Sequence, residues 1–208
     1  MTAAIICNGH IADYEFHARL VEGCSLVICA DGGACHAKRM GIKPHVILGD
    51  FDSCSREFAE GFPGVKIVEF PSEKDETDTE LAIQYALSSG EKHIMLLGAT
   101  GTRLDHTIAN LGLLMVIAQR GGTGEIINEQ NRAFLITDNA VVKGKGTQVS
   151  LIAYCGDVKG VTLKGFKYPL NDFTLEMGST RGISNVLEEE TGEISIKEGI
   201  LLAVLARD

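Results

Sequence analysis

Short apolar runs separated by helical patterns occupy the first 130 residues, and this alternation constrains the fold more than any other feature. The apolar runs lie in residues 3–9, 25–33, 45–50, 66–70, 93–99 and 125–128. Helical patterns lie between them, in residues 13–23, 34–41, 77–90 and 104–122. The alternation predicts an α/β fold with a doubly wound, mostly parallel sheet and helices on both faces.

The pattern changes near the segment NEQNRA at residues 128–133. Beyond it come short β-like runs joined by glycine-rich turns, without a helical pattern. This texture predicts a smaller, all-β sandwich domain. We therefore expect two domains, residues 1–130 and residues 131–208.

Composition excludes several classes of protein. The 208 residues are 45% hydrophobic and carry a formal net charge of −9, with no long run of Lys and Arg, which argues against a nucleic-acid partner. No apolar segment approaches the length of a signal peptide core or a membrane span, so we expect a cytoplasmic protein without a membrane partner. The six cysteines form no C-x-x-C pair, and we expect them to be reduced.

Two helix starts carry capping signatures. Thr77 and Glu80 form a T-x-x-E box, and Thr102 and Asp105 form a T-x-x-D pattern. Both signatures predict the N-terminus of a helix at this point of the chain. Asp78 and Asp105 are therefore expected in the first turns of two helices, where free N–H groups favour negative charge nearby.

Aspartates follow four consecutive strands of the predicted sheet. Because ligands of open parallel sheets bind beyond the carboxyl ends of the strands, we expect these aspartates to converge on one edge. Any one of them could instead cap a helix or start a turn. Their recurrence after four strands favours a common site. The set is Asp31, Asp50, Asp52, Asp75, Asp78 and Asp105.

Such a cluster needs counter-charge. Two carboxylates about 4 Å apart repel by roughly 4 kcal/mol at an effective dielectric near 20. The candidate ligand atoms are all hard carboxylate oxygens, and no His or Cys pair lies beside them. This set favours Mg²⁺ that is bound by the carboxylates and by substrate phosphates together. Between Asp50 and Asp52, Phe51 is expected to point the other way and pack, through the alternation of an extended segment.

Glycine-rich loops and two basic residues complete the predicted edge. The segments DGG at 31–33 and GATGT at 98–102 allow close approach of the backbone to a ligand, although neither is a P-loop. Lys74 and Arg103 are natural partners for polyphosphate oxygens. Their alternative is an ordinary surface ion pair with a neighbouring acid.

Six segments in order resemble the thiamine pyrophosphokinase family. They are ADGGA at 30–34, GDFDS at 49–53, KDETDTE at 74–80, GATGTRLDHTIANL at 98–111, GFKYPL at 165–170 and GISN at 182–185. The resemblance implies an α/β domain that binds ATP and Mg²⁺, a β-sandwich that binds thiamine, and a homodimer with active sites at the subunit junction. It implies transfer of the pyrophosphoryl group of ATP to the hydroxyethyl oxygen of thiamine, giving thiamine diphosphate and AMP.

The resemblance also implies roles for particular residues. It matches metal ligands to Asp50, Asp52 and Asp75, and candidate catalytic acids to Asp75, Asp78 and Asp105, without choosing the base. Thiamine contacts match Ser184 and Asn185. Contacts to ATP and its phosphates match Asp31, Gly32, Gly33, Lys74, Thr100, Gly101 and Arg103.

The chain departs from the family in one respect, and two other functions would fit the same edge of the sheet. Some members of the family place a tryptophan against the thiamine ring, and this chain has no Trp, so any stacking must use another apolar residue. The same edge could serve a pyrophosphokinase for another alcohol, such as a pterin. It could also serve a module that binds magnesium and nucleotide without catalysis.

Overall fold

The computed structural model describes residues 1–207 of the chain. The chain divides into two compact units, one from Met1 to Glu129 and the other beginning at Gln130. Each unit has its own hydrophobic core.

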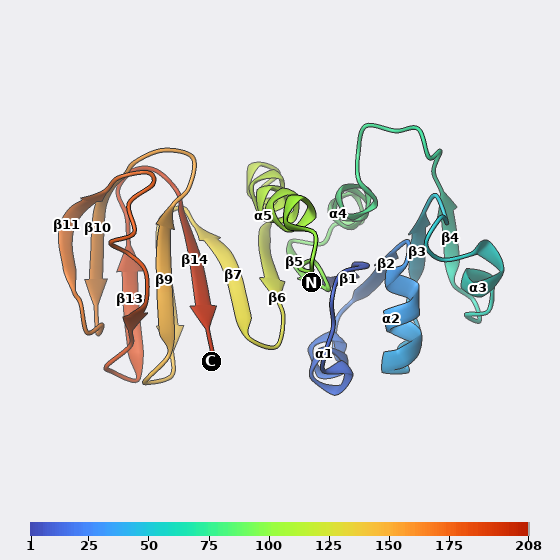
Figure 1. The fold of residues 1–208 in the computed structure, drawn as a ribbon, viewed down its shortest axis with the longest axis horizontal. Helices are drawn as coiled ribbons and strands as arrows, with labels where there is room; N and C mark the ends of the chain where they lie inside the picture. The colour runs from blue at the N-terminus through green and yellow to red at the C-terminus, as the bar shows by residue number, and fades with distance from the viewer. Residues whose placement is uncertain (208) are drawn as a thin grey trace. The chain divides into compact units, whose positions relative to one another are not determined.

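The first unit alternates strands and helices along its whole length (Figure 1). Its strands pair in the order β6-β5-β1-β2-β3-β4, and every pair is parallel. The elements are β1 (Thr2–Ile6), α1 (Tyr14–Val21), β2 (Leu26–Ala30), α2 (Gly33–Met40), β3 (Val46–Gly49), α3 (Arg56–Glu60), β4 (Lys66–Glu69), α4 (Asp78–Ser88), β5 (His93–Leu97), α5 (Leu104–Gln119) and β6 (Thr123–Ile127).

The central strands are apolar throughout because both faces of the sheet are covered. Residues 3–6 of β1 are fully buried, and β3 is buried from end to end. Helices α1 and α2 cover one face, and α4 and α5 cover the other (Figure 1). Burial on both faces requires near-continuous hydrophobic strands. The predicted doubly wound parallel sheet is confirmed.

The order of the strands creates a switch point between β1 and β5. From β1 the chain adds β2, β3 and β4 on one side, and it then crosses to place β5 and β6 on the other side. The chain therefore continues from β1 and from β5 into helices on opposite faces of the sheet, α1 and α5 (Figure 1). Crevices of this kind are the usual ligand sites of open α/β sheets.

The helix starts agree in part with the sequence signatures. The Thr77 hydroxyl accepts a hydrogen bond from the Glu80 N–H, and α4 begins at Asp78 as predicted. The prediction that Thr102 caps α5 is wrong, because Arg103 is the capping position and its side chain makes no capping bond. Arg103 has an extended backbone and its carbonyl accepts the first helical bond, from Thr107 N–H. Asp78 and Asp105 do lie in first turns, as predicted.

The second unit is all β among its described residues. Two antiparallel sheets have the orders β12-β9-β14-β7 and β11-β10-β13-β8. Alternate residues of the strands form a common core that includes Val149, Leu151, Val161 and Leu201. The predicted separate β domain is confirmed. The strands are β7 (Asn131–Ile136), β8 (Asn139–Lys143), β9 (Gln148–Ala153), β10 (Val158–Lys164), β11 (Leu170–Leu175), β12 (Asn185–Val186), β13 (Thr191–Ser195) and β14 (Leu201–Ala206).

Two further predictions concern membrane-spanning segments and the state of the cysteines. Among residues 1–207, no helix combines the length and the apolar character that a membrane crossing needs. All six cysteines are free thiols, as predicted.

Candidate functional site

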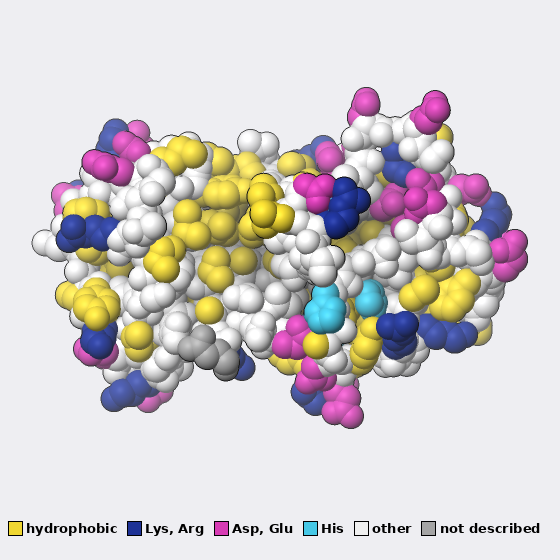
Figure 2. Space-filling model, viewed as in Figure 1, with side chains coloured by type: hydrophobic (Ala, Val, Ile, Leu, Met, Phe, Trp, Pro, Cys, Tyr) yellow, Lys and Arg dark blue, Asp and Glu magenta, His cyan; other side chains and the backbone are white. Residues whose placement is uncertain are grey.

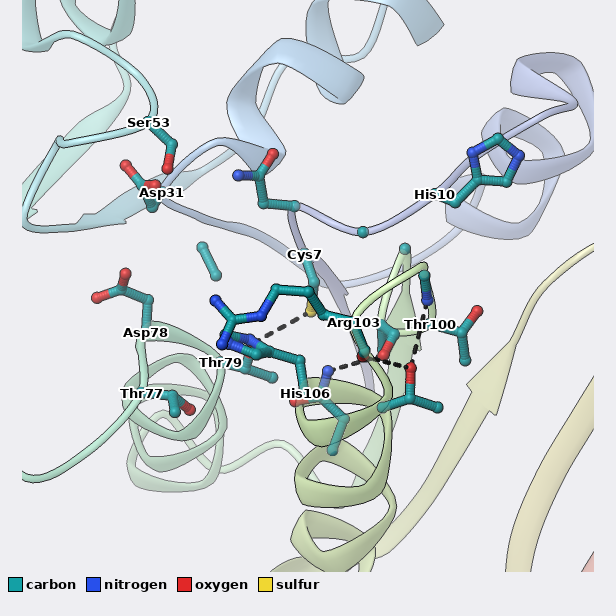
Figure 3. Close-up of a pocket in the computed structure, with 18 of the residues that line it drawn as sticks. Cys7, His10, Asp31, Ser53, Thr77, Asp78, Thr79, Thr100, Arg103 and His106 are labelled. Carbon is teal, nitrogen blue, oxygen red and sulfur yellow. Dashed lines mark hydrogen bonds between the residues drawn. The ribbon is translucent and has the colours of Figure 1, made fainter.

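A cavity of about 710 Å³ opens at the carboxyl edge of the first unit's sheet. Residues of the loops after β1, β2, β3 and β5 line it, together with the start of α4 and the first turns of α5. Asp31, Ser53 and Asp78 lie on one side of it, and Thr100, Arg103 and His106 lie on the other (Figure 3). Figure 2 shows acidic side chains gathered between α4 and the ends of β3 and β4. The cavity therefore has an acidic side next to β2 and β3 and a polar, basic side at α5.

Three aspartates meet at the acidic side. Asp31, Asp50 and Asp78 each direct one carboxylate oxygen to a common point, and these oxygens lie within 4.8 Å of one another. Asp31 is only 5% exposed. Asp31 Oδ1 and Asp78 Oδ1 are buried without a well-directed hydrogen bond from the described residues, although Lys74 Nζ lies 2.9 Å from the Asp78 oxygen. Buried oxygens without a donor are costly, and a bound cation would satisfy them.

Unusual backbone conformations place two of the residues around these acids. Asp31 has φ +44° and Phe51 has φ +62°, both in the left-handed region. Non-glycine residues adopt this region at a cost, and such outliers concentrate at functional sites. Gly49 adjoins Asp31 so closely that an added Cβ would lie 2.9 Å from the Asp31 Cβ. The ends of β2 and β3 are therefore shaped to bring Asp31 beside Asp50.

Phe51 packs against the hydrophobic core, as predicted. The predicted reason is wrong. The segment is not extended at this residue, because the positive φ turns the chain there.

Local electrostatics differ between Asp31 and Asp52. Burial raises the pKa of Asp31, hydrogen bonds from Ser53 and Gly32 lower it, and the charges of Asp52 and Asp78 raise it further, so that the net shift is upward. A hydrogen bond from the Ser53 hydroxyl, 2.8 Å from the Asp52 carboxylate, lowers the pKa of Asp52. Asp52 is thus held ionised at the exposed rim of the cavity.

Two predicted acids lie apart from this group. Asp75 is exposed and is not among the residues that line the cavity in the described chain. Asp105 is also exposed, and its carboxylate pairs with the Arg103 guanidinium at 2.6 Å. The structure brings together Asp31, Asp50 and Asp78, with Asp52 beside them. It places Asp75 and Asp105 at the periphery.

The two predicted basic residues lie at opposite sides of the cavity. Lys74 is mostly buried, and its Nζ lies 2.9 Å from Asp78 Oδ1 and 3.6 Å from Asp50 Oδ2. Arg103 lines the cavity but is exposed and held by Asp105. Each is paired with an acid, as the alternative interpretation held, and each lines the cavity.

The predicted glycines have different surroundings. Gly101, with Thr100, lines the cavity. Gly32 and Gly33 are not among its lining residues, because they pack against the chain itself. A Cβ on Gly33 would lie 1.9 Å from the Ile6 carbonyl oxygen, and one on Gly32 would meet the Asn8 side chain at 2.4 Å. The close approach made by these two glycines is to β1 and its loop.

Sequence reasoning missed the loop after β1. Residues 7–10 line the cavity, and backbone bonds from Gly9 to Gly98 and from His10 to Thr100 join this loop to the one after β5. Asn110 on α5 donates to the Ala99 carbonyl at 2.7 Å and fixes the second loop. The sequence signal for this loop was the glycine in CNGH, residues 7–10, with the polar residues beside it. Their meaning depends on β1 lying next to β5, which a single sequence does not reveal.

A chain of hydrogen bonds from α2 anchors the β1 loop. His36 Nε2 donates to the Gly9 carbonyl at 2.9 Å, because a carbonyl can only accept. The other ring nitrogen accepts from the Tyr14 hydroxyl at 3.0 Å, and Arg39 donates to the Tyr14 oxygen at 2.8 Å. Burial lowers the pKa of His36, and the positive charge of Arg39 adds to this effect. His36 therefore acts in its neutral form.

Replacing His36 by Phe is expected to remove the anchor and lower the melting temperature at pH 8. Because His36 is harder to protonate in the folded chain than in the unfolded chain, its stabilisation is complete above the ordinary histidine pKa of about 6.5 and is lost as the pH falls below it. The difference in melting temperature between the two proteins should shrink from pH 8 to pH 5. A constant difference across this range would contradict the neutral anchor.

The two residues predicted to contact thiamine lie in the second unit. Ser184 has φ +57°, and its N–H donates to the Ser150 hydroxyl. Asn185 is buried, and its side-chain amide makes a pair of bonds with the main chain of Tyr168, at 2.9 and 3.0 Å. The Asn185 amide is therefore committed to shaping the Tyr168 loop. Tyr168 itself is 59% exposed.

The acidic cluster fits a hard divalent cation. It offers carboxylate oxygens from three separate elements, and Asp31 Oδ1 is buried without a hydrogen bond from the described residues. Mg²⁺ prefers this ligand set and retains positions for water or phosphate oxygens. The fold and the cavity thus define an α/β protein with a candidate cation site at the carboxyl edge of a parallel sheet, beside β2 and β3, joined to a β-sandwich unit.

Comparison with known proteins identifies the family. The model described as "Thiamin pyrophosphokinase, catalytic domain" matches residues 17–123, and the model described as "Thiamin pyrophosphokinase, vitamin B1 binding domain" matches residues 135–201. The chain is 33% identical to thiamine pyrophosphokinase of Bacillus subtilis over 191 residues, covering 88% of each protein. The chain belongs to the thiamin pyrophosphokinase family.

Solved structures agree with this assignment. The crystal structure of thiamine pyrophosphokinase from Bacillus subtilis aligns over the whole of both chains with a TM-score of 0.90 and 28% identity. The crystal structure of thiamin pyrophosphokinase from Geobacillus thermodenitrificans aligns with a TM-score of 0.87 and 33% identity, covering 100% of this chain and 98% of that one.

Proposed function

We propose that the chain transfers the pyrophosphoryl group of ATP to the hydroxyethyl oxygen of thiamine, in a reaction that requires Mg²⁺ and yields thiamine diphosphate and AMP. The observation that carries this proposal is the meeting of Asp31, Asp50 and Asp78 at the carboxyl edge of the sheet. Membership of the family supplies the substrate class.

The residues of the first unit would hold the nucleotide and the cation. Asp31, Asp50 and Asp78 have the best placement for direct ligation, and Asp52 for a contact through water at the rim. Asp75 stays a proposed ligand only if the exposed segment that carries it moves inward. Lys74 and Arg103 would contact phosphate oxygens, and the Thr100–Gly101 loop would lie along the phosphate chain.

Positioning and charge stabilisation would provide most of the catalysis. Orientation of two substrates lowers a barrier by roughly 7–11 kcal/mol. Bound Mg²⁺ would supply several kcal/mol more by neutralising charge that develops on phosphate oxygens. Since phosphoryl transfer passes through a loose transition state, the base that takes the hydroxyl proton can be weak. Of the three candidate acids, Asp78 lines the cavity and Asp75 and Asp105 do not, so Asp78 would take the proton on the carboxylate oxygen that is not bound to the cation.

The second unit would bind thiamine, with Tyr168 as the aromatic residue that replaces the absent Trp. Thiamine carries a positively charged thiazolium ring and a flat pyrimidine, and both favour the face of an aromatic ring. The Tyr168 ring is exposed, and its face already attracts the Lys167 ammonium, 5.5 Å from the ring centroid. We propose a homodimer with active sites at the subunit junction, on the basis of the family resemblance.

The test is an assay for AMP and thiamine diphosphate with ATP, Mg²⁺ and thiamine, separated by liquid chromatography. We expect AMP and thiamine diphosphate in equal amounts, and neither product when thiamine is omitted or when EDTA exceeds Mg²⁺. A hydroxymethylpterin in place of thiamine tests the alternative alcohol. AMP formed only with the pterin would reassign the substrate, and ATP binding without AMP would leave a non-catalytic module.

A further inference from the structure

The ammonium group of Lys74 lies where the acidic cluster has its greatest need of positive charge. Its Nζ is 2.9 Å from Asp78 Oδ1 and 3.6 Å from Asp50 Oδ2, and these two carboxylates belong to the cluster of three. The side chains of Lys74, Asp50 and Asp78 are only 14%, 15% and 22% exposed. An ion pair this sheltered is screened much less by salt than a surface pair.

The Lys74 ammonium lies close enough to the carboxylates to offset their charge, but it is poorly oriented for hydrogen bonds to them. Although Nζ lies 2.9 Å from Asp78 Oδ1, that oxygen still lacks a hydrogen bond of acceptable direction, as does Asp31 Oδ1. An ammonium also has only three donors on one small atom, and it reaches two of the three carboxylates. Lys74 thus compensates the charge of the cluster without satisfying its oxygens.

We propose that Lys74 is an internal counter-ion that holds the cation site closed until a polyphosphate draws it away. This inference rests on the proposed function. With the acids free of metal, the ammonium offsets their mutual repulsion and stabilises the loop. A divalent cation at the point where Asp31, Asp50 and Asp78 converge would repel the ammonium strongly at this distance, so one must leave when the other enters.

A polyphosphate provides the place to which the ammonium moves. Lys74 lines the same cavity as the Thr100–Gly101 loop and Arg103, so its flexible side chain can turn from the carboxylates toward an incoming phosphate chain. That movement would release Asp50 and Asp78 for the metal. Nucleotide and metal would then each promote binding of the other, as thermodynamic linkage requires. The metal alone would bind weakly, which ties occupation of the site to the presence of substrate.

The decisive experiment measures binding of Mn²⁺ alone, without nucleotide or thiamine. Mn²⁺ accepts the same oxygen ligands as Mg²⁺, and its free form is counted directly by electron paramagnetic resonance. We expect Lys74→Met to bind Mn²⁺ at least about tenfold more tightly than the wild-type chain, a change of 1.4 kcal/mol. In EDTA the variant should melt at a lower temperature than wild type, and Mn²⁺ should raise its melting temperature by more.

Controls separate this effect from a general change in charge or folding. Lys159→Met removes the same charge from an exposed pair with Glu198, 3.0 Å long, and should leave Mn²⁺ binding unchanged. Lys74→Gln provides a second neutral variant if Lys74→Met does not fold. Adding Asp50→Asn to Lys74→Met should abolish the gain, because it removes a ligand of the released site.

Each outcome bears on the inference. Tighter Mn²⁺ binding by Lys74→Met that Lys159→Met lacks supports a displaceable counter-ion. Equal or weaker binding by both neutral variants, or an equal gain in Lys159→Met, overturns it. The proposed function is judged separately, by AMP formation in the wild-type chain. If the wild-type chain is active and Lys74→Met binds Mn²⁺ with the wild-type affinity, only the counter-ion role of Lys74 is overturned.

Discussion

Replacing Asp50 by Asn is expected to lower kcat/KM for pyrophosphoryl transfer by about 10³-fold or more while the chain stays folded. Metal ions contribute several kcal/mol to such reactions, and each 1.36 kcal/mol of barrier is a factor of ten in rate. Asp50 is one of three carboxylates that converge on one point. An amide of the same shape keeps the packing but lacks the charge that binds the cation. The measurement is steady-state kinetics with Mg²⁺ varied at saturating ATP and thiamine.

The folded state should tolerate this substitution because the Asp50 carboxylate faces the cavity. Removing one negative charge also lessens repulsion with Asp31 and Asp78, although Lys74 loses a partner. Asp172→Asn is the matched control. It removes the same charge from an exposed residue in the second unit, which pairs with Lys197 at 2.8 Å, and it should leave kcat/KM unchanged. If Asp50→Asn keeps wild-type activity at low Mg²⁺, Asp50 is not a ligand of the cation.

Much of the fold could be predicted because the first unit is locally consistent. Apolar runs such as Ile94–Leu97 are buried on both sides, and the Thr77 box marks the start of a helix both in sequence and in space. The start of α5 at Leu104 was predicted correctly, but its capping residue was not, because a T-x-x-D pattern leaves backbone conformation undetermined. Arg103, with its extended conformation, occupies the capping position instead.

From the sequence we could predict at which edge of the sheet the candidate site lies, but not which of the aspartates meet there. Knowing that strands end at a common edge places all six aspartates there, but it does not say which way each carboxylate points. Asp31 and Phe51 have positive φ, a backbone conformation that the sequence does not predict, at the place where Asp31, Asp50 and Asp78 come together. Asp75 and Asp105 lie in segments where no such constraint acts, and they face solvent. The contribution of residues 7–10 depends on the neighbouring strand β5, which is a property of topology.

Asn185 shows the same limit in the second unit. Its position in the GISN segment suggested a direct contact with thiamine, yet its amide bonds to the main chain of Tyr168. The segment retains a role in the proposed site through the residue that it holds. A motif marks which residues matter to a site, and contacts are needed to tell a ligand-binding side chain from the one that positions it.

Tyr168→Leu is expected to raise KM for thiamine by about ten- to thirtyfold, with KM for ATP unchanged. Leucine keeps an apolar side chain of moderate size but offers no π face, and cation–π and stacking contacts to a partly desolvated ring are each worth roughly 0.5–2 kcal/mol. The exposed ring belongs to the second unit, whereas the acidic cavity belongs to the first. A change confined to thiamine would therefore assign the two substrates to different units.

Two further variants make the assignment specific to the ring and its support. Tyr168→Trp restores a larger aromatic face and should match or lower the wild-type KM for thiamine, which no loss of fold would mimic. Asn185→Ala frees the Tyr168 main chain and leaves two of its polar groups without their partner, so it should raise KM for thiamine and lower the melting temperature together. If Tyr168→Leu and Tyr168→Trp change KM equally, packing of the loop rather than an aromatic face determines thiamine affinity. If neither variant changes it, thiamine binds away from Tyr168, and the residue that takes the place of the missing tryptophan must lie elsewhere in the chain.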